Sequence, residues 1–539
     1  MTKPEFIPVA PQAKRQRDLR LDFFRGLAMF IILLAHTPGN TWTLWIPARF
    51  GFSDATEIFV FCSGMASAMA FGAVYLKKSW FLGTARIAFR CWQVYWAHIG
   101  VIFATVILLI ALDKTGMGEE GKTYANWPSI VRIFSHTQEY LFGIFTLNFV
   151  PGLFDILPMY LVILAMIPVI MGIHKIGGRF AVFAFMLTLY TAAQFGGYLR
   201  LEAKIDDPTA WQVALFAFSE NFDFLNLPGS PWNENVNWFF NPFGWQLVFF
   251  TGFAFGVGWL PAPPVRRWLV LVAVGYILAT MPFAWHKLHG AAGFLAGTDL
   301  QTWIIETRSF IQPMWTKITV GPLRYLHFLA LAYVFWVAVG DGGVRLNEGW
   351  KAVVRSVGQR RLLALISAPV LVLTAPHTYT AEIAAFMPSL NAWILEHYWL
   401  IEGERIGLSQ LAHLLALITF IWNVIGDQAR QWLIRDAFVS IVPIIRKVGT
   451  QSLAVFMVSI VLSRFNGWWL DVLDRDVWSR FLVNGTGFAV LIATAYLVGW
   501  FKRQPWREDK KRNPQAVGGT PLSGTPVGQK SGQAETLRA

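Results

Sequence analysis

The residues best suited to chemistry are a basic pair in an otherwise apolar stretch near the start of the chain, Arg25 and His36. Eleven helical steps of about 100° separate them, and these return to within roughly 20° of the same direction. Both side chains would therefore share one helix face, about 16 Å apart along the axis. Because an ionisable side chain inside a membrane span is costly and usually functional, the pair predicts an anion site at one depth and proton chemistry at another.

Two carboxylates open the next apolar segment. Asp54 and Glu57 are three positions apart, so they share a helix face and enter the membrane at about the depth of His36. A histidine beside a carboxylate has the parts of a general base, because the carboxylate fixes the tautomer and stabilises the imidazolium. We therefore expect His36, Glu57 and Asp54 to be catalytic. The alternative is a histidine that is hydrogen-bonded between helices, with Glu57 as an interfacial cap.

A second basic group surrounds the next connection, where Lys77 and Lys78 precede Arg86 and Arg90. The two arginines are four positions apart and point the same way along a helix. With Arg25 they could hold phosphates by charge-assisted hydrogen bonds. For the two lysines, retention of positive charge on the cytoplasmic side explains their presence as well.

The elements that carry these residues are membrane helices. Of the 539 residues, 55% are hydrophobic and 14% are charged, and the mean hydropathy is +0.46. Apolar runs long enough to cross about 30 Å of hydrocarbon recur along the chain. The sequence predicts an all-α polytopic bundle of about twelve spans, at 21–38, 56–76, 88–111, 154–173, 179–199, 242–260, 267–286, 322–340, 361–376, 408–426, 450–468 and 482–501.

The basic residues also predict the orientation. Lysine and arginine gather in the N-terminal segment, in alternate connections and in the C-terminal segment, which places both termini in the cytoplasm. The same bias accounts for the net charge of +13, so we expect no nucleic-acid partner. Cys62 and Cys91 indicate no disulfide framework, and no metal site is predicted. Aromatic and amide side chains near Asn241 suit a carbohydrate, although an interfacial aromatic belt is the alternative.

Several blocks, in order along the chain, resemble the OpgC family, within the broader acyltransferase family three of integral-membrane enzymes. The first block carries the family's Arg-x(10)-His element. The blocks are RDLRLDFFRGLAMFIILLAH (17–36), FGFSDATEIFVFCSGMASA (50–68), FDILPMYLVIL (154–164), FFNPFGWQLVFFTGFAFG (239–256), GPLRYLHFLALA (321–332) and GTQSLAVFMVSIVLS (449–463).

The resemblance implies a bacterial inner-membrane enzyme that transfers succinyl groups from cytoplasmic succinyl-CoA to osmoregulated periplasmic glucans. Its active site would open to both compartments, and no cofactor would be bound permanently. The family is usually described with ten spans, so about two are extra here. We therefore expect a basic N-terminus (1–20), an acyltransferase core (21–340), an additional region (341–448), the last core spans (449–503) and a disordered cytoplasmic tail (504–539).

A dicarboxylic acyl group would need a cation for its free carboxylate, and the candidates are Lys317, Arg324 and His327. Polar or amphipathic residues in the matching blocks are expected to line the substrate cavity, namely Asp155, Trp245, Gln246 and Asn241. Two other functions stay open at this point. One is an O-acetyltransferase that uses another acyl-CoA on another envelope polysaccharide, and the other is a proton-coupled polysaccharide or lipid transporter. The sequence does not fix the oligomeric state.

Overall fold

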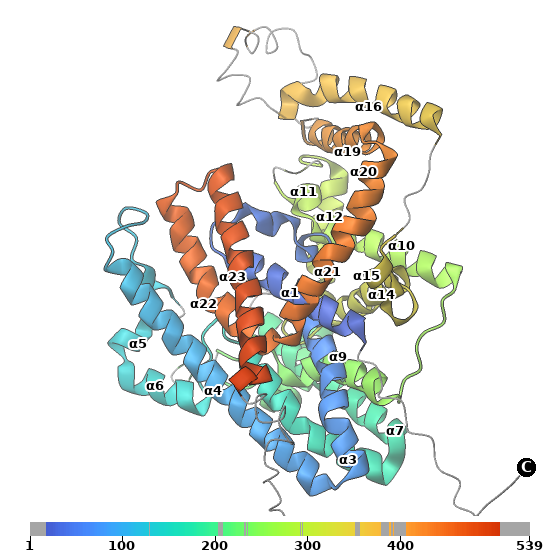
Figure 1. The fold of residues 1–539 in the computed structure, drawn as a ribbon. Coiled ribbons are helices and arrows are strands. Elements are labelled where there is room, and N and C mark those ends of the chain that lie inside the picture. The colour runs from blue at the N-terminus through green and yellow to red at the C-terminus, as the bar shows by residue number, and fades with distance from the viewer. Residues whose placement is uncertain are drawn as a thin grey trace, which may run out of the picture. The chain divides into compact units, whose positions relative to one another are not determined.

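The computed structural model describes residues 18–506, apart from 129, 203–208, 231–232, 234–235, 292, 294, 351–355, 379–387, 390–391 and 393–405. The chain divides into two units, Met1–Tyr496 and Leu497–Ala539, and the candidate site described below belongs to the first. The described residues form helices and loops, with one isolated bridge between Pro228 and Asn237 and no strand (Figure 1). The all-α prediction is confirmed. The basic segment 1–17 and most of the predicted tail, 507–539, lie outside the described residues.

In the described part, eight helices or helix runs are long and apolar enough to cross a membrane, so the chain has the character of a multi-pass membrane protein. The first is the run Ala55–Tyr75, which consists of α2 (Ala55–Ser67), η3 (Ala68–Gly72) and most of α3 (Ala73–Lys77). The others lie in α4 (Trp80–Asp113), α7 (Ile156–Glu202), α10 (Arg267–Ala284), α14 (Pro322–Val339), α16 (Val357–Thr378), α22 (Ser452–Val472) and α23 (Val477–Arg503).

The predicted number of twelve spans stays a prediction, although a helix covers each predicted range. α1 (Leu19–His36) carries three charged residues in its first half, and α9 (Pro242–Val257) is only 16 residues long. The predicted spans 154–173 and 179–199 are joined in α7, which is interrupted at Gly178 where φ is 67°. Ala412–Val424, within α19 (Ile406–Val424), and Asp427–Thr450 meet at a bend of 111°, as in a broken span or a re-entrant segment.

Shorter helices lie in the connections. They are α5 (Arg132–Ser135), α6 (Thr137–Thr146), α8 (Ala210–Ser219), α11 (His286–His289), α12 (Asp299–Phe310), α13 (Gln312–Trp315), α15 (Val344–Glu348) and α20 (Asp427–Gln431). A π-helical stretch, Trp432–Ala437, joins α20 to α21 (Phe438–Thr450), and 3-10 turns include Thr41–Trp45 and Tyr124–Asn126. The predicted additional region, 341–448, contains α15, α16, α19, α20 and α21, and its boundaries stay a prediction.

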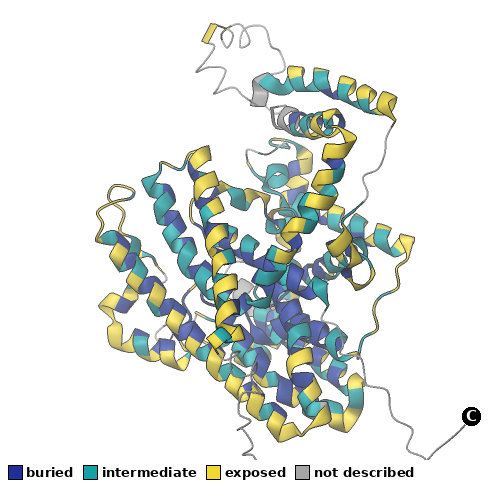
Figure 2. Ribbon diagram, in the orientation of Figure 1, coloured by how far each residue is buried: buried dark blue, intermediate teal, exposed yellow. Residues whose placement is uncertain are grey.

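The centre of the first unit is the contact between α2 and α9. A Cβ on Gly64 would lie 1.9 Å from the carbonyl oxygen of Phe249, and one on Gly252 would lie 2.2 Å from that of Phe61. Small residues at such crossings let membrane helices approach closely. Most of α9 is buried, whereas α16 is largely exposed (Figure 2). Because residue 61 meets 252 and residue 65 meets 256, the two helices run in the same direction and begin at the same end.

We predict that Gly64→Ala destabilises the protein, because the new Cβ would overlap the backbone of α9 and force the two helices apart. Overpacking of this kind costs about 1–3 kcal/mol. The matched control is Gly275→Ala on α10, where a Cβ would meet no atom within 4 Å. Thermal unfolding of both purified variants in one detergent is the measurement, and equal midpoints would contradict the packing argument.

Candidate active site

A short connection before α14, residues 316–321 (the strap), is fixed by hydrogen bonds from α7. The hydroxyl of Tyr190 donates to the carbonyl of Val320 at 2.8 Å, and Nε2 of Gln194 donates to the carbonyl of Thr319 at 2.7 Å. Val320 has a φ of 58°, a left-handed conformation that β-branched residues rarely adopt. Such strained backbone persists only where its surroundings hold it, as the α7 side chains do here.

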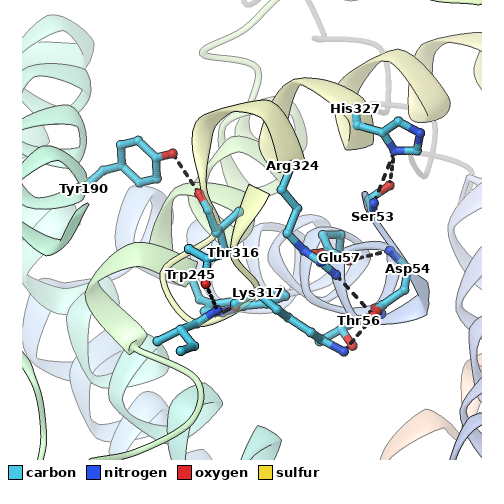
Figure 3. A network of polar contacts seen from close by, with 12 residues as sticks. Ser53, Asp54, Thr56, Glu57, Tyr190, Trp245, Thr316, Lys317, Arg324 and His327 are labelled. Atoms are coloured by element: carbon cyan, nitrogen blue, oxygen red, sulfur yellow. Dashed lines mark hydrogen bonds and ion pairs between the residues drawn. The ribbon is translucent and has the colours of Figure 1, made fainter. Parts of the chain in front are cut away.

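α9 holds the other side of the strap. The indole Nε1–H of Trp245 donates to the carbonyl of Lys317 at 3.0 Å, and the backbone N–H of Asn241 donates to that of Ile318 at 2.9 Å. The approach is close enough that a Cβ on Gly244 would lie 2.3 Å from a carbonyl oxygen of the strap. The backbone of Lys317 is therefore fixed, and its side chain extends towards the start of α2 (Figure 3).

At the start of α2, two carboxylates meet two cations (Figure 3). The ammonium of Lys317 lies 2.6 Å from Oδ2 of Asp54, and Nη2 of Arg324 lies 3.2 Å from the same oxygen. Nε of Arg324 also donates to Oε1 of Glu57. The side chain of Glu57 is fully buried and that of Arg324 is 7% exposed, whereas that of Lys317 is 31% exposed. We call these four residues the charge cluster, and Lys317 is its accessible member.

Local structure explains why both carboxylates face the cations. Asp54 is the N-cap of α2, and its carboxylate accepts a hydrogen bond from the backbone N–H of Thr56 at 2.6 Å. Glu57 accepts one from the N–H of Asp54 at 2.8 Å, which completes a capping box. Burial by itself would raise the pKa of Asp54, but the charges of Lys317 and Arg324 outweigh burial and hold that pKa below its ordinary value.

His327 lies one turn after Arg324 and contacts the residue that precedes Asp54. Its Nδ1 lies 2.7 Å from Oγ of Ser53 and accepts a weaker hydrogen bond from the N–H of Ser53 at 3.3 Å. Nδ1 is therefore the acceptor nitrogen, and in the neutral ring the proton is on Nε2. The ring packs so closely on Gly51 that a Cβ there would lie 2.2 Å from Nε2. This buried arrangement fixes the loop before α2.

His36 has a different partner from the one that the sequence predicts. It is the last residue of α1, and its Nδ1 donates to the carbonyl of Ile32 at 2.8 Å. Asp54 and Glu57 are instead bound to the cations of the charge cluster, so the expected contact between a carboxylate and the Nδ1 side of the ring is wrong. His36 is still within electrostatic range of Asp54 and Lys317. The structure thus brings the predicted residues near one another with different pairings.

Arg25 lies in the N-terminal half of α1, eleven residues before His36. Its guanidinium donates to Oγ of Ser452, the first residue of α22, whose N-terminus has no side-chain cap. Arg86 and Arg90 lie on α4: the guanidinium of Arg86 is 5.7 Å from the ring centroid of Phe71, and that of Arg90 binds a glutamine on its own helix. These contacts do not test the expected phosphate site of Arg25, Arg86 and Arg90, which stays a prediction.

The remaining predicted substrate residues have structural roles in addition to any contact with substrate. Asn241 caps α9 with its side-chain oxygen and donates from Nδ2 to a carbonyl at 2.8 Å. Gln246 is fully buried, and its Nε2 donates to the carbonyl of Met186 at 2.8 Å. Asp155 precedes α7 and accepts a hydrogen bond from the N–H of Leu153 at 3.2 Å. Of the predicted substrate residues, Asn241 and Trp245 contact the strap directly.

Two contacts at this site were not predicted. Ser53 pairs with His327, and Nη2 of Arg464 on α22 donates to the carbonyl of His36 at 2.6 Å. The available signal for Arg464 was a charge inside an apolar run, which is the same signal that indicated Arg25. Among the described residues, no group of three or more histidine, cysteine, aspartate or glutamate side chains lies close enough to hold a metal ion.

We predict that Arg324→Met lowers the free energy of unfolding by about 3–5 kcal/mol, because it leaves the buried Glu57 carboxylate without its partner. Adding Glu57→Gln to that variant removes the uncompensated charge and should restore part of the loss. Arg435→Met, at an arginine that is 59% exposed, is the control, and we expect a change within about 0.5 kcal/mol. Denaturant unfolding of the four proteins gives the result, and a double variant no more stable than Arg324→Met would contradict it.

The comparisons with known proteins identify the family of the chain. The profile of the family described as OpgC protein matches residues 17–366 and 359–503, which include α1, the charge cluster and α22. No curated protein and no solved structure matches the chain significantly. Because the family match covers most of the sequence, including every element that builds the candidate site, the chain belongs to the OpgC family.

Proposed function

We propose that this member of the OpgC family is a bacterial inner-membrane O-acyltransferase that moves a succinyl group from cytoplasmic succinyl-CoA to hydroxyls of a periplasmic glucan. His36 takes the proton of a glucan hydroxyl, and the oxygen attacks the thioester carbonyl. The carbon–sulfur bond breaks, and the proton passes from the imidazolium to the CoA thiolate. The products are a succinyl ester and free CoA. An acyl-histidine intermediate would give the same products.

The observation that carries the proposal is the hydrogen bond of the His36 ring. Because Nδ1 donates its proton to the carbonyl of Ile32, the neutral ring keeps its basic lone pair on Nε2. A histidine in this tautomer is ready to accept a proton from an alcohol. The carbonyl of Ile32 thus supplies the orientation that the sequence assigned to a carboxylate.

The charge cluster suits the free carboxylate of a succinyl group. Lys317 is its accessible member, and its ammonium has three N–H donors, one of which binds Asp54 at 2.6 Å. A carboxylate beside Lys317 would therefore find unused donors. Arg324 and His327 are engaged with protein partners, which makes Lys317 the first candidate.

The anionic part of the donor fits the N-terminal half of α1. Arg25 lies beside the uncapped N-terminus of α22, and both a guanidinium and a helix N-terminus favour negative charge. With the predicted orientation, this end faces the cytoplasm, where acyl-CoA is found. Arg86 and Arg90 on α4 stay candidates for the phosphates of CoA. In this arrangement, α1 extends from the cytoplasmic side, where acyl-CoA would enter, to His36, the proposed base.

We predict that His36→Ala lowers kcat for release of free CoA by about 10²–10⁴-fold, the usual contribution of a positioned general base. The assay uses purified protein in lipid nanodiscs with succinyl-CoA and a glucan oligosaccharide, and detects the free thiol. His136→Ala, at an exposed loop histidine, is the matched control. Full activity of His36→Ala would remove the assigned base. A protein that moves glucan across vesicles without cleaving the thioester would instead be a transporter.

We predict that Lys317→Met lowers kcat/KM for succinyl-CoA by about 10–100-fold, because a hydrogen bond to a charged group contributes about 1.5–3 kcal/mol. Turnover of acetyl-CoA, which has no second carboxylate, should change much less. Lys114→Met, in an exposed connection, serves as the control. Equal losses with both donors would contradict the carboxylate site, and a wild-type preference for acetyl-CoA would favour an acetyltransferase.

A further inference from the structure

The C-terminal turn of α1 is held by an unusually complete set of hydrogen bonds. The last carbonyls of a helix have no partner within the helix and need one elsewhere. Here the carbonyl of Ile32 accepts from the ring of His36, and that of Leu33 accepts from the hydroxyl of Thr37 at 2.8 Å. The carbonyl of His36 itself accepts from Nη2 of Arg464 at 2.6 Å. The residue that carries the proposed base is therefore bonded through both its ring and its backbone.

Arg464 is held in turn by an aromatic residue. Its guanidinium lies 4.6 Å from the centre of the Trp127 ring, and this cation–π contact fixes the plane of the guanidinium. The ring of Trp127 also packs against that of Phe154, with 6.1 Å between the centroids. Phe154 is buried and lies two residues before α7, so the aromatic contact of Arg464 is part of the packed core.

The same face of α22 makes two more contacts with the connection after α4. Arg464, Trp468 and Asp471 follow the spacing of one helix face. The indole of Trp468 donates to the carbonyl of Met117 at 3.1 Å, and Asp471 accepts from Lys122 at 2.7 Å. This face of α22 is thus fixed along two helical turns, and Arg464 is the member that reaches α1.

We infer that Arg464 is a positioning residue for His36, an inference that rests on the proposed role of His36 as the base. Without Arg464, the carbonyl of His36 loses its partner and the last turn of α1 can fray. The Nδ1 hydrogen bond depends on that turn, because its acceptor is the carbonyl four residues earlier. If the turn were lost, no hydrogen bond would fix the orientation of the His36 ring or keep its proton on Nδ1. A displacement of about 1 Å of a reacting group can cost roughly 100-fold in rate.

The test compares Arg464→Gln, Arg464→Lys and Lys122→Gln in the assay of free CoA. We expect Arg464→Gln to lower kcat by about 10–100-fold, while KM for each substrate stays within about threefold. Arg464→Lys keeps the charge and one donor and should recover part of kcat. Lys122→Gln breaks an ion pair with the same face of α22, without touching α1, and should keep the wild-type kcat.

A second pair of variants tests the cation–π contact with Trp127 without altering Arg464. Trp127→Leu removes the ring beneath the guanidinium and should lower kcat in the same direction by a smaller factor, whereas Trp127→Phe keeps a ring and should be milder. If Arg464→Gln does not fold, Arg464→Lys and the Trp127 pair decide the question. A wild-type kcat in Arg464→Gln, or a rise in KM that accounts for the whole loss, would overturn the inference.

Two outcomes separate this inference from the proposed function. If His36→Ala is inactive and Arg464→Gln retains full kcat, the base stands and the positioning role is overturned. If His36→Ala retains full activity, the base assignment itself is wrong, and the positioning role is overturned with it. If His36→Ala and Arg464→Gln both lose kcat and Arg464→Lys recovers part of it, the result supports His36 as the base and Arg464 as its positioning residue.

Discussion

The buried charge cluster is the interaction on which the rest of the site depends. Asp54 and Glu57 begin α2, and their partners Lys317 and Arg324 lie more than 250 residues later in the chain. An uncompensated charge in a buried setting is costly, so the two acids and two cations are stable only together. This requirement joins the start of α2 to the strap and to the start of α14. The hydrogen bonds from α7 and α9 to the strap then fix where Lys317 can reach.

The cluster and α1 together give the proposed reaction its geometry. α1 has a cation in its N-terminal half, beside the N-terminus of α22, and a histidine at its C-terminal end, within electrostatic range of Lys317 and Asp54. Close packing of backbones, as at Gly64 against α9, leaves little freedom for these elements to shift. The donor, the base and the free carboxylate of the acyl group would therefore meet fixed partners, which is what preorganised catalysis requires.

Several pairings could not be read from the sequence because local hydrogen bonds compete with distant ones. A carboxylate near His36 was expected to orient the ring, but the carbonyl of Ile32, one turn earlier on the same helix, does so. The carboxylates were in turn bound by cations whose positions only the folded chain reveals. Asn241 illustrates the same limit: an amide that could bind a sugar is used to cap α9. Arg86 and Arg90 share a helix face as expected, but their contacts with an aromatic ring and with a glutamine could not be read from their spacing.

The sequence by itself determined that the chain is helical and apolar enough for several membrane spans, and it identified the residues with the capacity for chemistry. Composition and periodicity suffice for this, since apolar runs of about 20 residues cross a membrane as helices, which satisfy their own backbone polar groups. The capping box at Asp54 and Glu57 is likewise a local feature, because that motif spans only four residues. Only the tertiary structure decided which side chains pair with one another. Such contacts join segments that are hundreds of residues apart, and their geometry follows from how closely the helices pack.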